Sequence, residues 1–168
     1  MLPAKFYSEL IVWQLATELK QEVYRLVRIS PANRDFDFRK QIFKAAAGTP
    51  QHIIEGFGRI YPGDFARFLT FALGSMNETE GWLSDGVDRG HWSEQELRAG
   101  RVLLRRLTPA LRNLHRYLST LPPRTPWRDL VWRDARLSEP VTPGEPGEPG
   151  EPGEPDEPGD RVEPKEPT

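Results

Sequence analysis

The stretch SEQELRAGRVLLRRLTPALRNLHRYLSTL, residues 93–121, decides the fold class. Over about seven helical turns it repeats leucines at spacings of three, four or seven, which places them on one face of an α-helix. The seven are Leu97, Leu104, Leu107, Leu111, Leu114, Leu118 and Leu121. Ser93 and Glu96 have the spacing of a capping box, which predicts that the helix begins at Ser93. We expect Pro109 to bend this helix and Pro122 to end it.

Three segments before it show the same apolar periodicity, at residues 5–29, 35–57 and 62–88. Their predicted buried faces are Val12, Ala16, Leu19, Val23 and Leu26; Phe38, Ile42, Ala45, Thr49, Ile53 and Phe57; and Phe65, Phe68, Leu69, Ala72, Met76 and Leu83. No alternating run of β-branched residues indicates a strand. Four amphipathic helices with short connections predict an all-α protein, an antiparallel up-down-up-down four-helix bundle over residues 1–121.

The second of these helices carries three local signals. The small residues 45–48 predict close approach of another helix. Pro50 inside the apolar pattern predicts a kink, because proline removes a helical hydrogen bond. Gly56 and Gly58 predict a helix end with a glycine in the left-handed conformation.

The charge is distributed unevenly along the chain. Residues 139–168 hold ten acidic and two basic residues, a net charge of −8, and contain Gly-Glu-Pro four times over residues 144–155. Residues 1–138 hold 21 basic and 15 acidic residues, a net charge of +6. We expect residues 139–168 to form a disordered, solvated tail, since they lack apolar residues for a core. The basic body favours a polyanionic partner for which the tail could compete, or the charge serves solubility alone.

Residues 122–138 form a short extension that contains Trp127 and Trp132 among arginines. Paired tryptophans are rarely left in water, so this segment either docks on its own bundle or binds a partner through Trp127 and Trp132. The first alternative is favoured.

Several function classes find no support in the composition. The chain has no cysteine, which excludes disulfides, thiolate zinc sites and cysteine nucleophiles. No signal peptide or membrane span is visible, so a cytoplasmic protein is expected. His52 and Glu55 have a reversed and unrepeated version of the di-iron spacing, which fits a buried carboxylate or a salt bridge to Arg59 better than a metal ligand set. We predict no catalytic residues, no metal site and no cofactor.

The last helix carries the strongest candidate for a binding site. Arg98, Arg101, Arg105, Arg112 and Arg116 fall within an arc of roughly 60° when each residue turns the helix by about 100°. Such a row could follow a phosphate backbone, because arginine binds phosphate through two parallel hydrogen bonds. The alternative is a solvated face or ion pairs to acidic residues of other helices. The candidate acidic residues are Glu18, Glu22, Glu78 and Glu80.

Three motifs in order resemble a known family. They are residues 10–16 (LIVWQLA), residues 49–59 (TPQHIIEGFGR) and residues 64–80, which contain DFARFL, ALGS and ETE. Over about residues 6–120 the chain resembles the bacterial four-helix bundle proteins encoded in 23S ribosomal RNA intervening sequences, which include relatives of the accessory protein of diversity-generating retroelements. The chain departs from the family in having His52-Ile53-Ile54 where Asn-Ile-Ala is usual. It also has Tyr61 where a serine would cap the third helix, a loss of about 1 kcal/mol.

The resemblance implies a ring-like homopentamer and, in the retroelement branch, a basic surface that binds RNA and a partner reverse transcriptase. We therefore expect a non-catalytic, homo-oligomeric accessory protein that binds RNA or, less favoured, DNA. The alternative is a protein–protein scaffold in which the arginines are ion-paired.

Overall fold

The structure, a computed structural model, describes residues 4–129. It contains four long helices, α1 (Ile11–Ile29), α2 (Phe36–Phe57), α3 (Pro62–Asp88) and α4 (Arg98–Thr120), and two short 3-10 helices, η1 (Tyr7–Glu9) and η2 (Pro31–Arg34). Within residues 4–129 there is no strand, so the all-α prediction is confirmed. The Gly-Glu-Pro tail and residues 130–138 of the predicted extension lie outside the described residues.

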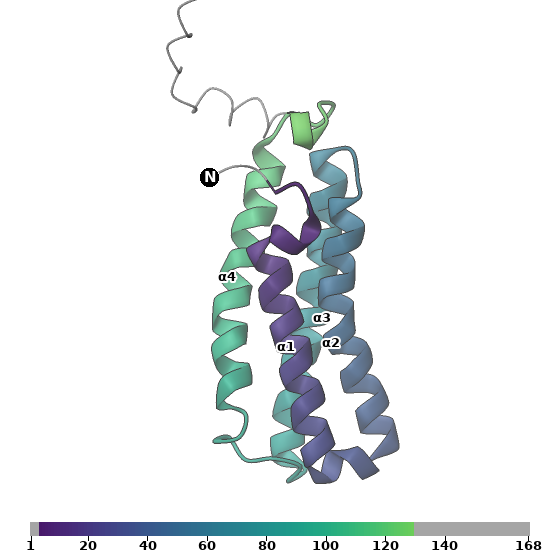
Figure 1. The fold of residues 1–168 in the computed structure, drawn as a ribbon, viewed down its shortest axis with the longest axis vertical. Helices are drawn as coiled ribbons and strands as arrows, with labels where there is room; N and C mark the ends of the chain where they lie inside the picture. Colours follow the sequence, from purple (N-terminus) through teal and green to yellow (C-terminus); the bar gives the residue numbers. More distant parts are fainter. Residues whose placement is uncertain (1–3, 130–168) are drawn as a thin grey trace, which may run out of the picture.

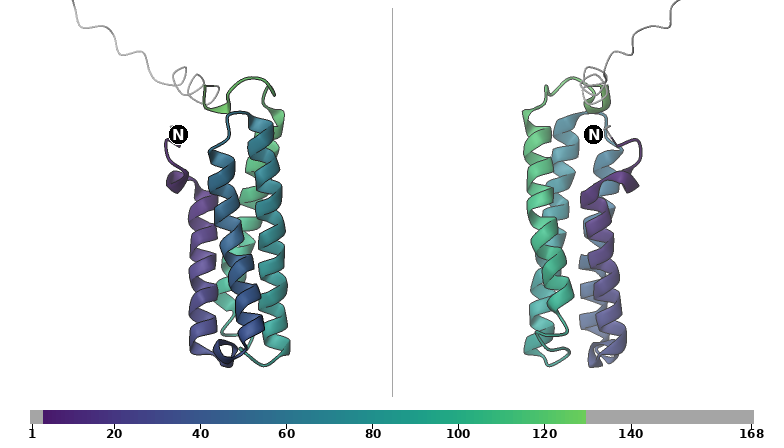
Figure 2. Two further views of the ribbon diagram at one scale, coloured as in Figure 1. Left: turned by 90° about the vertical axis from the view of Figure 1, so that its right-hand side faces the viewer. Right: turned by 60° about the vertical axis from the view of Figure 1, so that its left-hand side comes forward.

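The four long helices lie side by side along one long axis (Figures 1 and 2). The chain reverses after each helix, so helices that follow each other in sequence run in opposite directions (Figure 1). Helix α1 packs against α2 and α4, and α3 packs against the same two neighbours. Each long helix therefore packs against two neighbours and keeps an outer face with exposed residues.

The apolar stripes predicted for the four helices meet in the centre. Every residue predicted for the buried faces of the first three helices is buried, as are Leu97, Leu104, Leu107, Leu111 and Leu118 of the fourth. Leu114 and Leu121 are half-buried at the edge of the core. Each large apolar side chain removed from water contributes about 1.5–3 kcal/mol to stability. None of the helices within residues 4–129 has a stretch apolar and long enough to cross a bilayer.

Small residues of α2 bring it close to α3, as predicted. A Cβ added to Gly48 would lie 2.6 Å from Ser75 Oγ, and one added to Gly56 would lie 2.5 Å from a ring carbon of Phe65. The prediction of a left-handed glycine at the end of α2 is wrong, because Gly58 has a φ of −71°. Gly56 is needed for packing, and its conformation is helical. Helix α2 continues through the buried Pro50.

The predicted start of the first helix at Lys5 is wrong, since α1 begins at Ile11. The backbone N–H of Lys5 donates to the Glu9 carboxylate, 2.8 Å away, and Leu10 is extended with a ψ of 122°. This local bond closes a separate turn that competes with helix formation. Gln14 then ties that turn to α1 by donating from Nε2 to the carbonyl oxygen of Ser8 at 2.9 Å.

The capping box at Ser93 forms, but the regular helix α4 begins at Arg98. The Ser93 N–H donates to Glu96 Oε2 at 2.8 Å, and the Glu96 N–H donates to Ser93 Oγ at 3.3 Å. Ser93 Oγ also donates to Glu96 Oε2, at 2.8 Å, and the two bonds that the Glu96 carboxylate accepts from Ser93 lower the pKa of this carboxyl. Arg98 N then bonds the carbonyl oxygen of Gln95, three residues back, so residues 94–97 form a tight turn before the α-helical pattern starts.

Candidate nucleic-acid interface

The two helices that border the candidate site differ sharply in charge. Helix α4 has six arginines and no acidic residue. The arginines are Arg98, Arg101, Arg105, Arg106, Arg112 and Arg116. Its neighbour α3 has one basic residue, Arg67, against five acidic residues, Asp64, Glu78, Glu80, Asp85 and Asp88. Acidic side chains able to neutralise the arginine row therefore lie on the adjacent helix, and their positions decide which arginines stay open.

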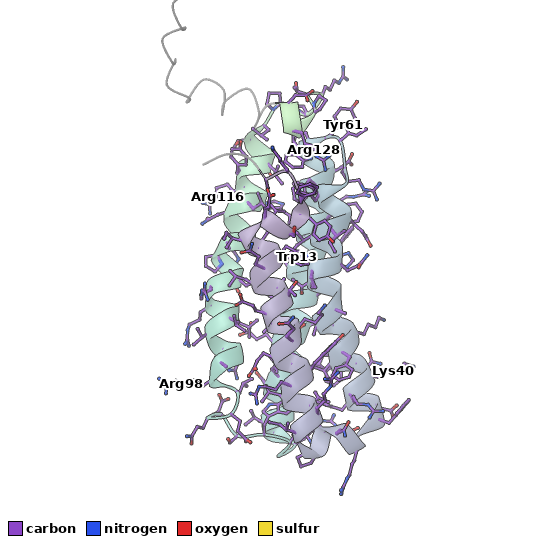
Figure 3. The ribbon with its side chains drawn as sticks, in the orientation of Figure 1. Trp13, Lys40, Tyr61, Arg98, Arg116 and Arg128 are labelled. Carbon is purple, nitrogen blue, oxygen red and sulfur yellow. The ribbon has the colours of Figure 1, made fainter. Side chains whose placement is uncertain are left out.

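Four of the five predicted arginines are exposed: Arg98, Arg105, Arg112 and Arg116. Figure 3 shows Arg98 and Arg116 near opposite ends of α4, on the outer side of the molecule, with Lys40 on the far side. Eighteen residues separate Arg98 from Arg116, which corresponds to about 27 Å along the helix. Within residues 4–129 no ion pair involves any of these four guanidinium groups.

Arg101 differs from the other four because its guanidinium is already bound within the protein. Its Nη2 atom donates to Glu94 Oε1 at 3.1 Å and to Ser84 Oγ at 3.2 Å. Its Nη1 atom lies 3.8 Å from Glu80 Oε1. A surface pocket of about 480 Å³ lies here, lined by Glu80, Arg101, Leu104, Arg105, Thr108 and Pro109. Of the five predicted arginines, four are thus exposed without an ion pair among the described residues, and Arg101 is neutralised.

Four acidic residues were expected as possible partners of the arginine row. Among the described residues, only Glu80 of these four forms an ion pair with an arginine of α4. Glu22 instead binds Arg25 on its own helix at 2.7 Å. This hydrogen bond raises the pKa of the Arg25 guanidinium. The ion-paired alternative therefore applies to Arg101 alone among the five predicted arginines.

His52 and Glu55 form a contact on the surface of α2. His52 Nδ1 lies 3.7 Å from Glu55 Oε2, and Gln51 Nε2 donates to Glu55 Oε1 at 3.3 Å. Glu55 therefore lies beside His52, a contact that is an ion pair only when the imidazole is protonated. The expectation of Arg59 as the partner of Glu55 is wrong, because Arg59 lies over the ring of Phe68 instead. Among the described residues, no group of three or more potential metal ligands lies together.

Trp127 packs inside the end of the molecule. It is 5% exposed, and its ring contacts Phe57 and Phe65 with centroids 5.3 and 5.4 Å apart. Its indole Nε1 donates to the carbonyl oxygen of Arg59 at 2.9 Å. The favoured self-docking of this segment holds for Trp127, and its buried ring is unsuited to binding a partner. Trp132 lies outside the described residues.

A second arginine-rich surface was not predicted from the sequence. Arg59 lies over the ring of Phe68, with Cζ 4.6 Å from the centroid, and Arg67 lies within 6.0 Å of the rings of Phe68 and Phe71. The spacing of four between Arg67 and Phe71 could have indicated their contact on one helix. Arg59 lies in the connection between α2 and α3, whereas Phe68 lies on α3, so no helical period in the sequence predicts their contact.

The geometry defines a helical protein with an open arginine row on its last helix. The chain belongs to the family of 23S rRNA-intervening sequence proteins, whose family model matches residues 8–113. The match includes α1 to α3 and most of α4, and therefore Arg98, Arg105 and Arg112 of the row. A comparison with curated proteins finds no match.

Proposed function

We propose that this chain is a non-catalytic, homo-oligomeric accessory protein that binds RNA along α4 of an antiparallel four-helix bundle. The observation that carries the proposal is the row of four exposed arginines on a helix without acidic residues. Arginine binds phosphate oxygens in pairs and stays charged at any physiological pH, which suits a polyanionic backbone. Membership of a family named for an rRNA insertion favours RNA over DNA.

The proposed assembly is the homopentamer that the family resemblance implies, and the proposed protein partner is a reverse transcriptase encoded nearby. Five copies would present five arginine rows to one RNA, and such multivalent binding strengthens retention without new contacts. Native mass spectrometry of the full chain tests the pentamer. A co-purification with the neighbouring reverse transcriptase, where its gene is present, tests the partner.

A salt-titrated gel shift with structured RNA and a duplex DNA of equal length tests nucleic-acid binding. The variant replaces Arg98, Arg105, Arg112 and Arg116 by glutamine. Its matched control removes four exposed positive charges elsewhere, by replacing Arg28, Arg34, Lys40 and Lys44 by glutamine. We expect the logarithm of affinity to fall linearly with the logarithm of salt concentration, by about 0.7–0.9 per phosphate contact. The first variant should lose most of that slope and the control should keep it.

A protein–protein scaffold without nucleic acid is the second candidate function. Exposed apolar side chains on the α2–α3 side support it: Ile60 is 62% exposed, Phe71 46% and Tyr61 45%. In that case RNA retention would be weak and equal in both charge variants, and replacing Ile60 and Phe71 by serine would abolish partner capture.

A further inference from the structure

The segment after α4 is fastened to the connection between α2 and α3. The Trp127 N–H donates to the carbonyl oxygen of Ile60 at 3.1 Å, and its indole donates to that of Arg59. Arg128 Nη2 donates to the carbonyl oxygen of Phe57 at 2.9 Å, which satisfies an end of α2 that carries negative partial charge. These bonds hold the described end of the chain beside the α2–α3 connection, and Figure 3 shows Arg128 and Tyr61 at this same end.

A patch of arginine and aromatic side chains lies next to this connection. We define the arginine–aromatic patch as Arg59, Arg67, Phe68 and Phe71, which are linked by the ring contacts given above. Both arginines are exposed, and Phe71 is 46% exposed. Among the described residues, neither Arg59 nor Arg67 has a carboxylate partner in an ion pair. The patch thus combines uncompensated positive charge with an open aromatic surface.

The sequence beyond the described residues has the complementary chemistry. Residues 144–155 repeat Gly-Glu-Pro four times, so that Glu145, Glu148, Glu151 and Glu154 recur every third position. A polyproline II helix has three residues per turn and rises about 3.1 Å per residue. In that conformation the pattern would place carboxylates along one edge about 9 Å apart and proline rings along another. Proline-rich segments of this kind bind aromatic-lined surfaces.

We propose that the Gly-Glu-Pro segment docks on the arginine–aromatic patch of its own chain. Carboxylates of the repeat pair with Arg59 and Arg67, and a proline ring packs on Phe71. The patch suits this segment better than the α4 arginine row, because the α4 arginines have no ring contact with an aromatic side chain among the described residues. The proposal is independent of nucleic-acid binding by α4.

The chain is long enough for this contact. Sixteen residues separate Asp129 from Glu145, and an extended chain of that length spans at most about 50 Å. The described chain ends beside Arg59, since Trp127 bonds the carbonyl oxygens of Arg59 and Ile60. A tethered ligand reaches an effective concentration on the order of millimolar, so the charge pairs and the proline contact together need only a dissociation constant of about that size to keep the patch occupied at low salt.

Photo-crosslinking of the full chain, without nucleic acid, tests the proposal. The chain has no cysteine, so the variant Gly150→Cys carries a benzophenone maleimide at one position in the middle of the repeat. Mass spectrometry then maps the crosslinks after illumination. We expect them to concentrate in residues 59–71 and to fall about fivefold at about 0.5 M salt, where the Debye length is about 4 Å.

Three sets of substitutions complete the test, and the last of them is the matched control. Replacing Glu145, Glu148, Glu151 and Glu154 by glutamine leaves the bundle intact and should reduce the crosslinks as much as salt does. Replacing Arg59 and Arg67 by glutamine should do the same, whereas replacing Arg28 and Arg34 should not. Crosslinks spread evenly, centred on residues 98–116, or insensitive to the glutamates would overturn the proposal. A band of twice the chain mass carrying most of the crosslinks would also overturn it, because docking would then be between copies.

Discussion

The indole nitrogen of Trp127 donates a hydrogen bond to the carbonyl oxygen of Arg59, 2.9 Å away and 68 residues earlier in the sequence. The ring closes the end of the core over Phe57 and Phe65, where a helical bundle would otherwise expose aromatic surface. The segment after α4 is therefore part of the packed protein as far as Trp127.

Truncation of Trp127 should destabilise the protein markedly. Trp127→Ala removes a buried ring and leaves a cavity against Phe57 and Phe65, a change that costs about 3 kcal/mol. Trp127→Phe keeps an aromatic ring but loses the bond to Arg59 and part of the buried ring area, and it should cost less, about 1–2 kcal/mol. Urea denaturation of both variants measures the difference. Equal midpoints for Trp127→Ala and the parent chain would show that this end of the core does not contribute to stability.

Gly86 should be irreplaceable, because Trp92 lies directly against it. A Cβ at Gly86 would overlap ring atoms of Trp92, whose indole is fixed by a bond from Nε1 to the carbonyl oxygen of Leu83 at 2.9 Å. We expect Gly86→Ala to cost about 2 kcal/mol or more through overpacking.

Gly81 on the same helix provides the matched control. Nothing lies within 4 Å of a Cβ added there, so Gly81→Ala should stabilise α3 by about 0.5–1 kcal/mol. Thermal unfolding of the two variants checks both signs. A stable Gly86→Ala variant would mean that Trp92 can leave its site at little cost.

The core was predictable from the sequence because helical burial follows a period of 3.6 residues. Ile42, Leu69 and Leu107 lie on predicted stripes and are fully buried. The helix starts were less predictable, because they depend on competing local bonds such as that from Lys5 to Glu9. The spacing of apolar residues does not show whether a local side-chain hydrogen bond or a further helical turn is more stable.

The candidate site, like the fold, could be predicted from the sequence only in part. The exposure of Arg98 and Arg112 follows from their position opposite the leucine face, and the sequence predicts it. The neutralisation of Arg101 depends on Glu94 and Glu80, and the second comes from another helix. The Arg59–Phe68 contact likewise needs α2 and α3 to be placed first. Contacts between elements carry no local period, so sequence reasoning missed them.

Asp35 should make stability depend on acidic pH. The N–H of Phe38 donates to Asp35 Oδ1 at 3.2 Å and lowers the pKa of this carboxyl, with further lowering from His91 and Arg89. A carboxyl with a lowered folded-state pKa stabilises the fold above its unfolded pKa of about 3.9, and this contribution is lost as pH falls through the folded-state value. Asp35→Asn should therefore melt below the parent chain at pH 7.

The same comparison continued to a pH below the lowered folded-state pKa of Asp35 completes this test, since the side chain of residue 35 is then uncharged in both chains. The two melting temperatures should converge there. Asp37→Asn removes a carboxylate from the same helical turn without a capping bond, and its effect should be smaller. A gap between Asp35→Asn and the parent chain that stays constant from pH 7 down to that pH would contradict the assigned role of the carboxylate.

The arginines of α4 should contribute unequally to RNA binding. Arg101→Gln and Arg105→Gln remove the same charge from the same helix, but the guanidinium of Arg101 is held by Glu94 and lies near Glu80. We expect Arg105→Gln to weaken RNA binding about threefold to tenfold and to reduce the salt slope by about 0.7–0.9. Arg101→Gln should have a clearly smaller effect.

Glu80→Gln provides the opposite change at the same place. It removes a negative charge beside the row and loosens the hold on Arg101, so RNA binding should become tighter at low salt and the gain should vanish as salt screens the row. Filter binding at three salt concentrations measures all three variants. Equal losses in Arg101→Gln and Arg105→Gln would mean that RNA displaces the ion pairs of Arg101. No loss in either variant would remove α4 as the binding surface, because a phosphate contact at Arg105 is what the exposed row requires.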